Sequence, residues 1–250
     1  YSLANIANGF VTDTFWYGIL RFVSGFGLAG ELGAGITLVS EMMSKEKRGY
    51  GTMIIVTFGA LGAVAASLVG STGAGLANLF SNILSFPIAP WQAAYLLGGI
   101  MGLTLLLLRV GTIEYNFYNT IKTKESVKKG SFKILFSSRK NALKYLYCIL
   151  IGIPIWYVIG LIIMNSKDDF GPWLGLSNVS NGKAVMYAYI GLSLGDLISG
   201  FLSQWLKSRK IVVKIYLGFT AITCLTFLIF IKQISLENYY LFCFLLGTGT

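Results

Sequence analysis

Arg21, Glu31 and Asp196 are ionisable residues that lie inside long apolar segments of the sequence. A charge that faces lipid at the bilayer centre costs at least roughly 2.5–3.5 kcal/mol, so such residues are expected to face a cavity or a partner. We predict that Arg21 and Glu31 face a cavity. For Asp196 the favoured interpretation is structural, an ion pair or helix-end contact near Arg209 and Lys210.

Glu31 is the predicted proton-coupling residue. It lies about midway along a predicted helix over residues 14–43, roughly 25 Å from the start of that helix. Desolvation disfavours a charged carboxyl, so Glu31 should bind a proton more readily in a closed cavity than in a hydrated one. Arg21 is about 80° around the helix and roughly 15 Å away along its axis, so the two cannot pair directly. The alternative is that Glu31 only hydrogen-bonds a neighbouring helix.

Other site chemistries have little support in this sequence. Histidine is absent, which removes His-ligated zinc and the Ser-His-Asp and Cys-His types of catalysis. The three cysteines lie far apart in apolar runs, and no Cys-x-x-Cys pair is present. Since no metal-ligand cluster or nucleophile–base pair is evident, we predict that the protein is not an enzyme and uses no metal or cofactor.

One glycine motif needs a different interpretation. Gly25 to Gly30 matches G-x-G-x-x-G, but a dinucleotide site needs a preceding strand, and these glycines lie inside an apolar helix. Small residues at four-residue spacing instead predict close helix contacts in lipid. Two such rows are present, namely Gly25, Ala29 and Gly33, and Gly62, Ala66 and Gly70.

The composition is that of an all-α polytopic membrane protein. Hydrophobic residues make up 55% of the chain and charged residues 12%, whereas a soluble domain carries about 25% charged residues. The net charge is +10. Because the basic residues are clustered between apolar runs, they indicate a membrane surface and membrane lipids as partners, with no nucleic acid.

The apolar runs define the predicted spans. Gly49 to Leu108 contains no Asp, Glu, Lys or Arg over 60 residues, which is enough for two spans and a connection. Leu79, Phe80, Ile83 and Leu84 suggest a short interfacial helix in that connection. Six complete spans are predicted, over residues 14–43, 51–75, 91–108, 145–166, 184–206 and 215–231. Partial spans are predicted over residues 1–11 and 238–250, so both ends of the sequence look cut.

Every second loop is basic. The loop from Arg109 to Lys144 alone holds nine Lys and Arg residues, and residues 45–48 and 207–214 are basic as well. By the positive-inside rule these loops face the cytoplasm, although binding of anionic lipid is an alternative use of the long loop. The predicted organisation is an N-terminal transmembrane bundle (1–110), a cytoplasmic basic linker (111–141) with surface helices in Thr120 to Lys140, and a C-terminal transmembrane bundle (142–250).

One series of residues extends along the first predicted span and its basic end. Arg21, a glycine run and Glu31 are followed by Glu41 and then by Arg48-Gly49. The series resembles the fourth helix, with its cytoplasmic end, of transporters of the major facilitator superfamily, most closely of the sugar-porter and metabolite:proton-symporter branches, with Ser44 where proline is common. A second match places Gly200 to Ser203 and Ser208-Arg209-Lys210 in a basic loop, although Gln204 and Trp205 replace its usual Asp and Arg. A third, weaker match is Glu114.

The resemblance implies two six-helix bundles that rock around a central solute site, with this sequence running from late helix three to helix ten. It implies a cytoplasmic gate and a substrate cavity. The gate residues would be Glu41, Arg48, Glu114, Asp196 and Arg209. The cavity residues would be Arg21, Glu31, Trp156, Tyr157 and Thr248. Pro154 would kink helix seven, and Gly247 and Gly249 would be flexible points of helix ten.

The predicted function is secondary active transport of a small polar solute, with protons as coupling ion. A sugar, an organic acid or a similar metabolite would fit, and the sequence alone does not choose between them. The predicted location is the cell membrane, which means the inner membrane if the source is bacterial. The alternative is a membrane receptor or structural membrane protein that does not transport.

Overall fold

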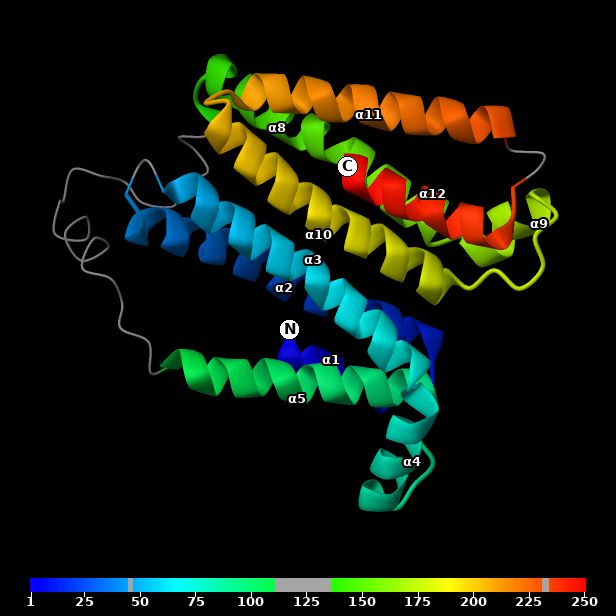
Figure 1. Cartoon of the computed structure of the whole chain (residues 1–250). Coiled ribbons are helices and arrows are strands. Elements are labelled where there is room, and N and C mark those ends of the chain that lie inside the picture. Colours follow the sequence, from blue (N-terminus) through cyan, green and yellow to red (C-terminus); the bar gives the residue numbers. More distant parts are fainter. Residues whose placement is uncertain (45–46, 111–135, 231–233) are drawn as a thin grey trace, which may run out of the picture. The chain divides into compact units, whose positions relative to one another are not determined.

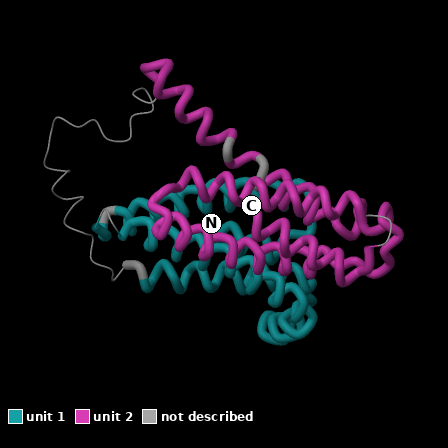
Figure 2. The backbone as a smooth tube through the Cα atoms, turned by 45° about the horizontal axis from the view of Figure 1, so that its top comes forward, with its two compact units in different colours: residues 1–113 teal, residues 114–250 magenta. Residues whose placement is uncertain are grey.

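The chain forms two helical units. The computed structural model describes residues 1–44, 47–110, 136–230 and 234–250, and every regular element in these ranges is a helix. The chain separates into unit 1, residues 1–113, and unit 2, residues 114–250 (Figure 2). The surface helices predicted in Thr120 to Lys140 fall mostly in 111–135, outside the described residues.

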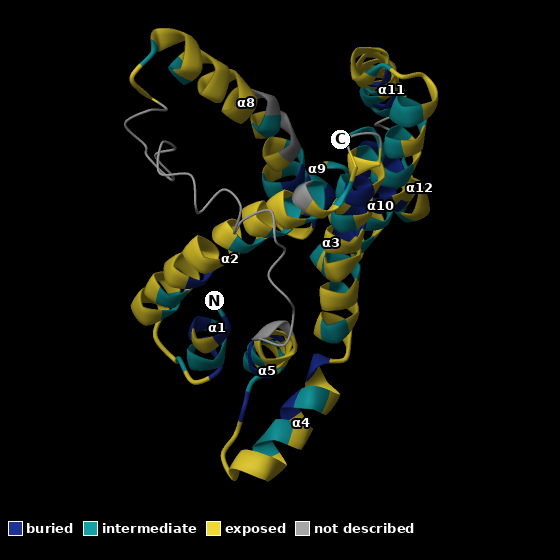
Figure 3. Ribbon diagram, turned by 90° about the vertical axis from the view of Figure 1, so that its left-hand side faces the viewer, coloured by how far each residue is buried: buried dark blue, intermediate teal, exposed yellow. Residues whose placement is uncertain are grey.

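The described residues of unit 1, 1–44 and 47–110, form five helices. They are α1 (Ser2–Asn8), α2 (Thr14–Met42), α3 (Arg48–Ser71), α4 (Gly73–Leu84) and α5 (Pro90–Val110). The short helix α1 lies between α2 and α5 and packs against both (Figure 3). The α2–α3 connection and the end of α5 lie at one end of the unit, while α4 and the start of α2 lie at the other (Figure 1). This arrangement puts Lys47, Arg48 and Arg109 at a common end, as the alternation of loop charge requires, whereas Arg21 lies within α2 nearer the other end.

The interfacial helix expected after the second span is present as α4. The preceding helix α3 begins at Arg48 and ends at Ser71, so it is shifted toward the N-terminus relative to the predicted span over 51–75. Ala77 of α4 packs with Ile88, Ala93 and Leu96, whereas Ile83 is 68% exposed. One buried face and one exposed apolar face suit a helix at a membrane surface.

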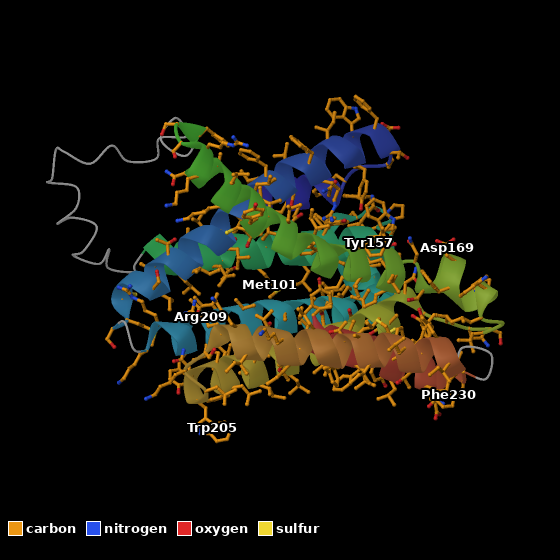
Figure 4. The ribbon with its side chains drawn as sticks, turned by 90° about the horizontal axis from the view of Figure 1, so that it is seen from above. Met101, Tyr157, Asp169, Trp205, Arg209 and Phe230 are labelled. Carbon is orange, nitrogen blue, oxygen red and sulfur yellow. The ribbon has the colours of Figure 1, made fainter. Side chains whose placement is uncertain are left out.

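Unit 2 has the following elements. They are α8 (Arg139–Tyr157), the π-helices η1 (Val158–Ile163) and η2 (Ser166–Phe170), α9 (Gly171–Trp173), α10 (Asn181–Trp205), α11 (Arg209–Phe230) and α12 (Leu236–Gly249). Trp205 and Arg209 lie at one end of the unit, and Asp169 and Phe230 lie at the opposite end (Figure 4). The basic α10–α11 connection and the acidic pair in η2 are therefore on opposite sides.

Side-chain caps set the starts of three long helices. The Asp13 carboxylate accepts hydrogen bonds from the backbone N–H groups of Phe15 and Trp16 at 3.1 and 3.3 Å. Ser180 caps α10 and Ser235 caps α12 in the same way. A cap satisfies backbone donors that have no partner inside the helix, so each apolar segment begins at a defined residue.

The α10–α12 pair is the closest helix contact in unit 2. A Cβ placed on Gly247 would overlap the backbone carbonyl of Ala188, and one on Gly191 would overlap the carbonyl of Phe244. Small residues thus let two backbones touch, as expected where lipid removes the hydrophobic drive for association. The glycines of α12 are predicted as flexible points; in the structure Gly247 lies in the middle of this contact and α12 is helical to Gly249, and their flexibility stays a prediction.

The two small-residue rows predicted to make helix contacts do not make them in the described residues. A Cβ on Gly25, Gly33, Gly62 or Gly70 would have no neighbour within 4 Å. The close contacts in unit 1 instead involve Gly99 and Gly102 of α5, which lie against Ile6 and Ser2 of α1. Four-residue spacing identifies faces able to approach another helix, but it does not say which of them has a partner.

Five α-helices in the described ranges are long and apolar enough to cross a membrane. They are α2, α3, α5, α10 and α11, which correspond to five of the six predicted complete spans. The sixth, predicted over 145–166, is instead an α-helix that begins at Arg139 and changes to the π-helix η1 at Val158. This change follows Pro154, which has no N–H to donate within the helix.

Candidate functional site

An aromatic cluster joins α2 to α5 near the start of both helices. It consists of Tyr17, Trp91 and Tyr95, and we refer to these residues as the aromatic cluster. The hydroxyl groups of Tyr17 and Tyr95 are 2.8 Å apart and share a hydrogen bond. Each pair of rings meets edge to face, with centroids 5.9–6.1 Å apart. Such contacts favour a defined arrangement of the rings over a loose apolar packing.

Arg21 lies one helical turn deeper on α2 than Tyr17. Its guanidinium carbon is 5.6 Å from the centre of the Tyr95 ring, within the range of a cation–π contact. Among the residues that the structure describes, Arg21 has no carboxylate partner. The next turn of α2 is tied to α1 by a hydrogen bond of 2.9 Å from the Ser24 hydroxyl to the Asn5 side chain. The guanidinium is therefore held beside the aromatic cluster by a fixed pair of helices.

A cavity of about 320 Å³ opens beside the aromatic cluster. We call it the cluster cavity, and its lining consists of residues 11–14 together with Tyr17, Trp91 and Tyr95. Gln92 fixes the loop, because its side-chain amide donates to the Val11 carbonyl at 3.0 Å and accepts from the Ala89 N–H at 2.9 Å. The cavity thus has one wall of aromatic rings and one of backbone held in place by hydrogen bonds.

Glu31 lies on the same helix as Arg21 and is half-buried. It is further along α2, and the rise of about 1.5 Å per residue separates the two charges by roughly 15 Å. No direct contact between them is present, in agreement with the helix geometry. The coupling role of Glu31 stays a prediction.

Two of the other predicted cavity residues, Trp156 and Tyr157 at the end of α8, line a common cavity of about 540 Å³. They are 68% and 57% exposed, and Tyr157 is labelled in Figure 4. Thr248 is on α12, where its hydroxyl donates to the Phe244 carbonyl at 2.9 Å and its backbone lies against Gly195. Thr248 therefore occupies a helix-packing position in unit 2, and its predicted contact with solute remains untested.

The predicted cytoplasmic gate is only partly described. Glu114 and the side chain of Glu41 lie outside the described part of the structure. The Arg48 Nε–H donates to the Met43 carbonyl at 3.2 Å, so Arg48 holds the backbone that follows the end of α2. This contact gives Arg48 a structural role beside the gating role that the resemblance implies.

Asp196 and Arg209 do not form the ion pair considered for them. One carboxylate oxygen of Asp196 is buried and has no hydrogen-bond partner among the described residues. Arg209 is the exposed first residue of α11. Tyr216 of α11 lies nearby and donates to the carbonyl of Gly195 at 3.0 Å. The carboxyl of Asp196 is thus set between α10 and α11 without a cation beside it in the described ranges.

Sequence reasoning missed the aromatic cluster. Its signal is a pair of four-residue spacings, Tyr17 with Arg21 and Trp91 with Tyr95, each of which puts two side chains on one helix face. Only the packing of α2 and α5 around α1 brings the two faces together. No group of His, Cys, Asp and Glu residues able to hold a metal ion is found in the described ranges.

The family model that matches this sequence is the one for the Major Facilitator Superfamily, over residues 1–250. The chain belongs to this superfamily. The resemblance inferred from the motifs around Arg21 and Arg48 is thereby confirmed. As a superfamily member the chain is a multi-pass membrane protein from a family of transporters rather than enzymes.

Two curated relatives of this superfamily member are niacin transporters by name. The chain is 27% identical over 227 residues to the "Putative niacin/nicotinamide transporter NiaP" of Bacillus subtilis (strain 168), in a match that covers 88% of the chain and 52% of the relative. It is 33% identical over 100 residues to the "Niacin transporter NiaP" of Acinetobacter baylyi (strain ATCC 33305 / BD413 / ADP1), covering 40% of the chain and 20% of that protein. The chain thus spans about half the length of the first relative.

Proposed function

We propose that the full-length protein is a secondary active transporter that moves a small solute across the membrane by alternating access. The observation that carries the proposal is a basic and an acidic residue, Arg21 and Glu31, on one membrane-spanning helix of a superfamily member. Ionisable residues at such depth are costly unless they face a cavity or a partner, and within a span they therefore often mark a solute or proton pathway. The similarity to proteins named as niacin transporters favours a solute of that size, a pyridine with a carboxylate or amide group.

Proton coupling is the second part of the proposal. The carboxyl of Glu31 is half-buried in a span and can carry a proton between two differently hydrated states of the protein. Sugars and aliphatic organic acids, which the sequence alone allows, become the comparison solutes.

A binding screen tests the proposed solute class. We expect nicotinate or nicotinamide to raise the unfolding temperature of the full-length protein, because a ligand that binds only the folded state stabilises it by mass action. A hexose and an aliphatic dicarboxylate at the same concentration should leave the unfolding temperature unchanged. Stabilisation by the hexose alone would contradict the assignment and would favour a sugar transporter.

A further inference from the structure

The cluster cavity has the size and walls of a site for one small ring. Its volume of about 320 Å³ is at the lower end of the range for small-molecule sites. Trp91 meets Tyr17 at an interplanar angle of 89° and Tyr95 at 83°. In an edge-to-face contact only one of the two rings presents a face, so the three contacts leave other ring faces of the cluster unused, and a further planar ring can stack on them or meet them edge-on.

Two charges lie near the cluster: the Asp13 carboxylate lines the cavity, whereas the Arg21 guanidinium is outside the lining and is 5.6 Å from the centre of the Tyr95 ring. The carboxylate of Asp13, in the lining, already accepts two backbone N–H groups at the start of α2, where the helix dipole also stabilises its negative charge. Arg21 makes only a cation–π contact with Tyr95 among the described residues. A guanidinium gains more from a two-pronged hydrogen bond with a carboxylate than from a ring face, so Arg21 can leave Tyr95 for such a ligand.

We propose that the aromatic cluster and Arg21 form a recognition site for a small planar aromatic carboxylate. The ring of the ligand lies in the cluster cavity against Trp91 and Tyr17, and its carboxylate is bound by Arg21. The paired hydroxyls of Tyr17 and Tyr95 supply a hydrogen-bond donor to a ring nitrogen. This inference rests on the proposed function, because it describes how the transported solute is recognised.

The proposed site predicts a preference for a carboxylate ligand over its amide counterpart. An uncharged amide keeps the ring contacts but loses the charge of its carboxylate counterpart opposite Arg21, so the site should select nicotinate over nicotinamide. Benzoate, which keeps the carboxylate and lacks the ring nitrogen, should bind more weakly than nicotinate and more tightly than benzamide.

Binding of radiolabelled nicotinate to the full-length protein in lipid nanodiscs tests the site with two matched variants. Trp91→Leu removes a wall of the cluster cavity and should weaken binding by about tenfold, the upper range for one aromatic contact. Trp16→Leu is the control, because Trp16 is exposed on α2, close in sequence to Tyr17, and does not line the cavity. It should change affinity by less than about twofold.

Arg21→Gln tests the charge. It should reduce the preference for nicotinate over nicotinamide by about tenfold or more, while the affinity for nicotinamide stays nearly constant. Unfolding temperatures of all variants check that each is folded. Equal loss of affinity in Trp91→Leu and Trp16→Leu, or an unchanged preference in Arg21→Gln, would overturn the site.

The outcomes separate this site from the proposed function. Wild-type protein that binds and transports nicotinate, with variants that behave like wild type, removes the site and leaves the function. Wild-type protein that binds none of these aromatic compounds removes the site and the proposed solute class, and leaves transport of another small solute. Tighter binding of an aromatic cation, such as N-methylnicotinamide, than of nicotinate would also overturn the site by assigning the dominant charge to Asp13 instead of Arg21.

Discussion

Replacing Glu31 with Gln in the full-length protein is expected to abolish solute accumulation driven by a pH gradient while solute exchange continues. Gln has nearly the shape of a protonated Glu and cannot release a proton, so the variant permanently resembles the protonated form of the protein. The accumulation ratio should fall to about one, and exchange of internal for external solute should change by less than about tenfold.

Glu237→Gln is the matched control for this change. Glu237 is exposed in the first turn of α12, outside the interior of a span, so the same replacement there should leave accumulation intact. The comparison needs reconstituted vesicles with a known internal pH. If the Glu31→Gln protein still concentrates solute as wild type does, Glu31 is not the coupling residue and only hydrogen-bonds within the fold.

Replacing Gly247 with Ala is expected to destabilise unit 2 strongly for so small a change. The added Cβ would overlap the backbone carbonyl of Ala188, and a backbone atom cannot move aside as a flexible side chain can. Overpacking of this kind costs about 1–3 kcal/mol. If α10 and α12 move apart to make room for the added carbon, the other contacts between them are lost as well. Thermal unfolding of the purified full-length protein should show a transition lowered by several degrees.

Gly218→Ala is the control for that experiment. Gly218 is a helical glycine of α11, and a Cβ there would have no neighbour within 4 Å. The substitution should be neutral or stabilise the protein by up to about 1 kcal/mol, because alanine is the better helix former. Equal unfolding temperatures for the two variants would show that α10 and α12 do not approach each other as closely as described.

The transmembrane architecture was predictable because it depends on local properties of the sequence. The charge-free stretch from Gly49 to Leu108 is long enough for two spans whatever packs around them, and α3 and α5 are found there. The motif around Arg21 and Arg48 likewise allowed the superfamily to be inferred from the sequence. Boundaries were less predictable: α3 starts at Arg48, three residues before the predicted span, and ends at Ser71, four residues before its predicted end.

The candidate site could be predicted only in part, because its groups come from distant parts of the chain. Arg21 was identified from its cost in a membrane, but its neighbour Tyr95 belongs to another helix. Tyr17 and Tyr95 are 78 residues apart and meet only through the packing of α1 between their helices. Aromatic residues are also common in spans for other reasons, so their type alone gave no sign of a cluster.

The glycines also show that the spacing of residues in a sequence does not identify the helix they pack against. The rows at Gly25 and Gly62 have the spacing of a contact surface and no neighbour in the described residues, whereas Gly247 looked like a flexible point and is tightly packed. A glycine in a sequence marks a place where a backbone can bend or can be approached. Which of the two applies depends on the partner helix, which the spacing does not specify.

Nicotinate accumulation in proteoliposomes tests the central claim most directly. The full-length protein is reconstituted, an inward proton gradient is imposed, and internal nicotinate is compared with that in protein-free liposomes under the same gradient, since a weak acid also distributes passively. The account predicts rapid accumulation above the protein-free level that collapses when a protonophore is added. Uptake no faster and no higher than in protein-free liposomes, by protein that is folded, would contradict it.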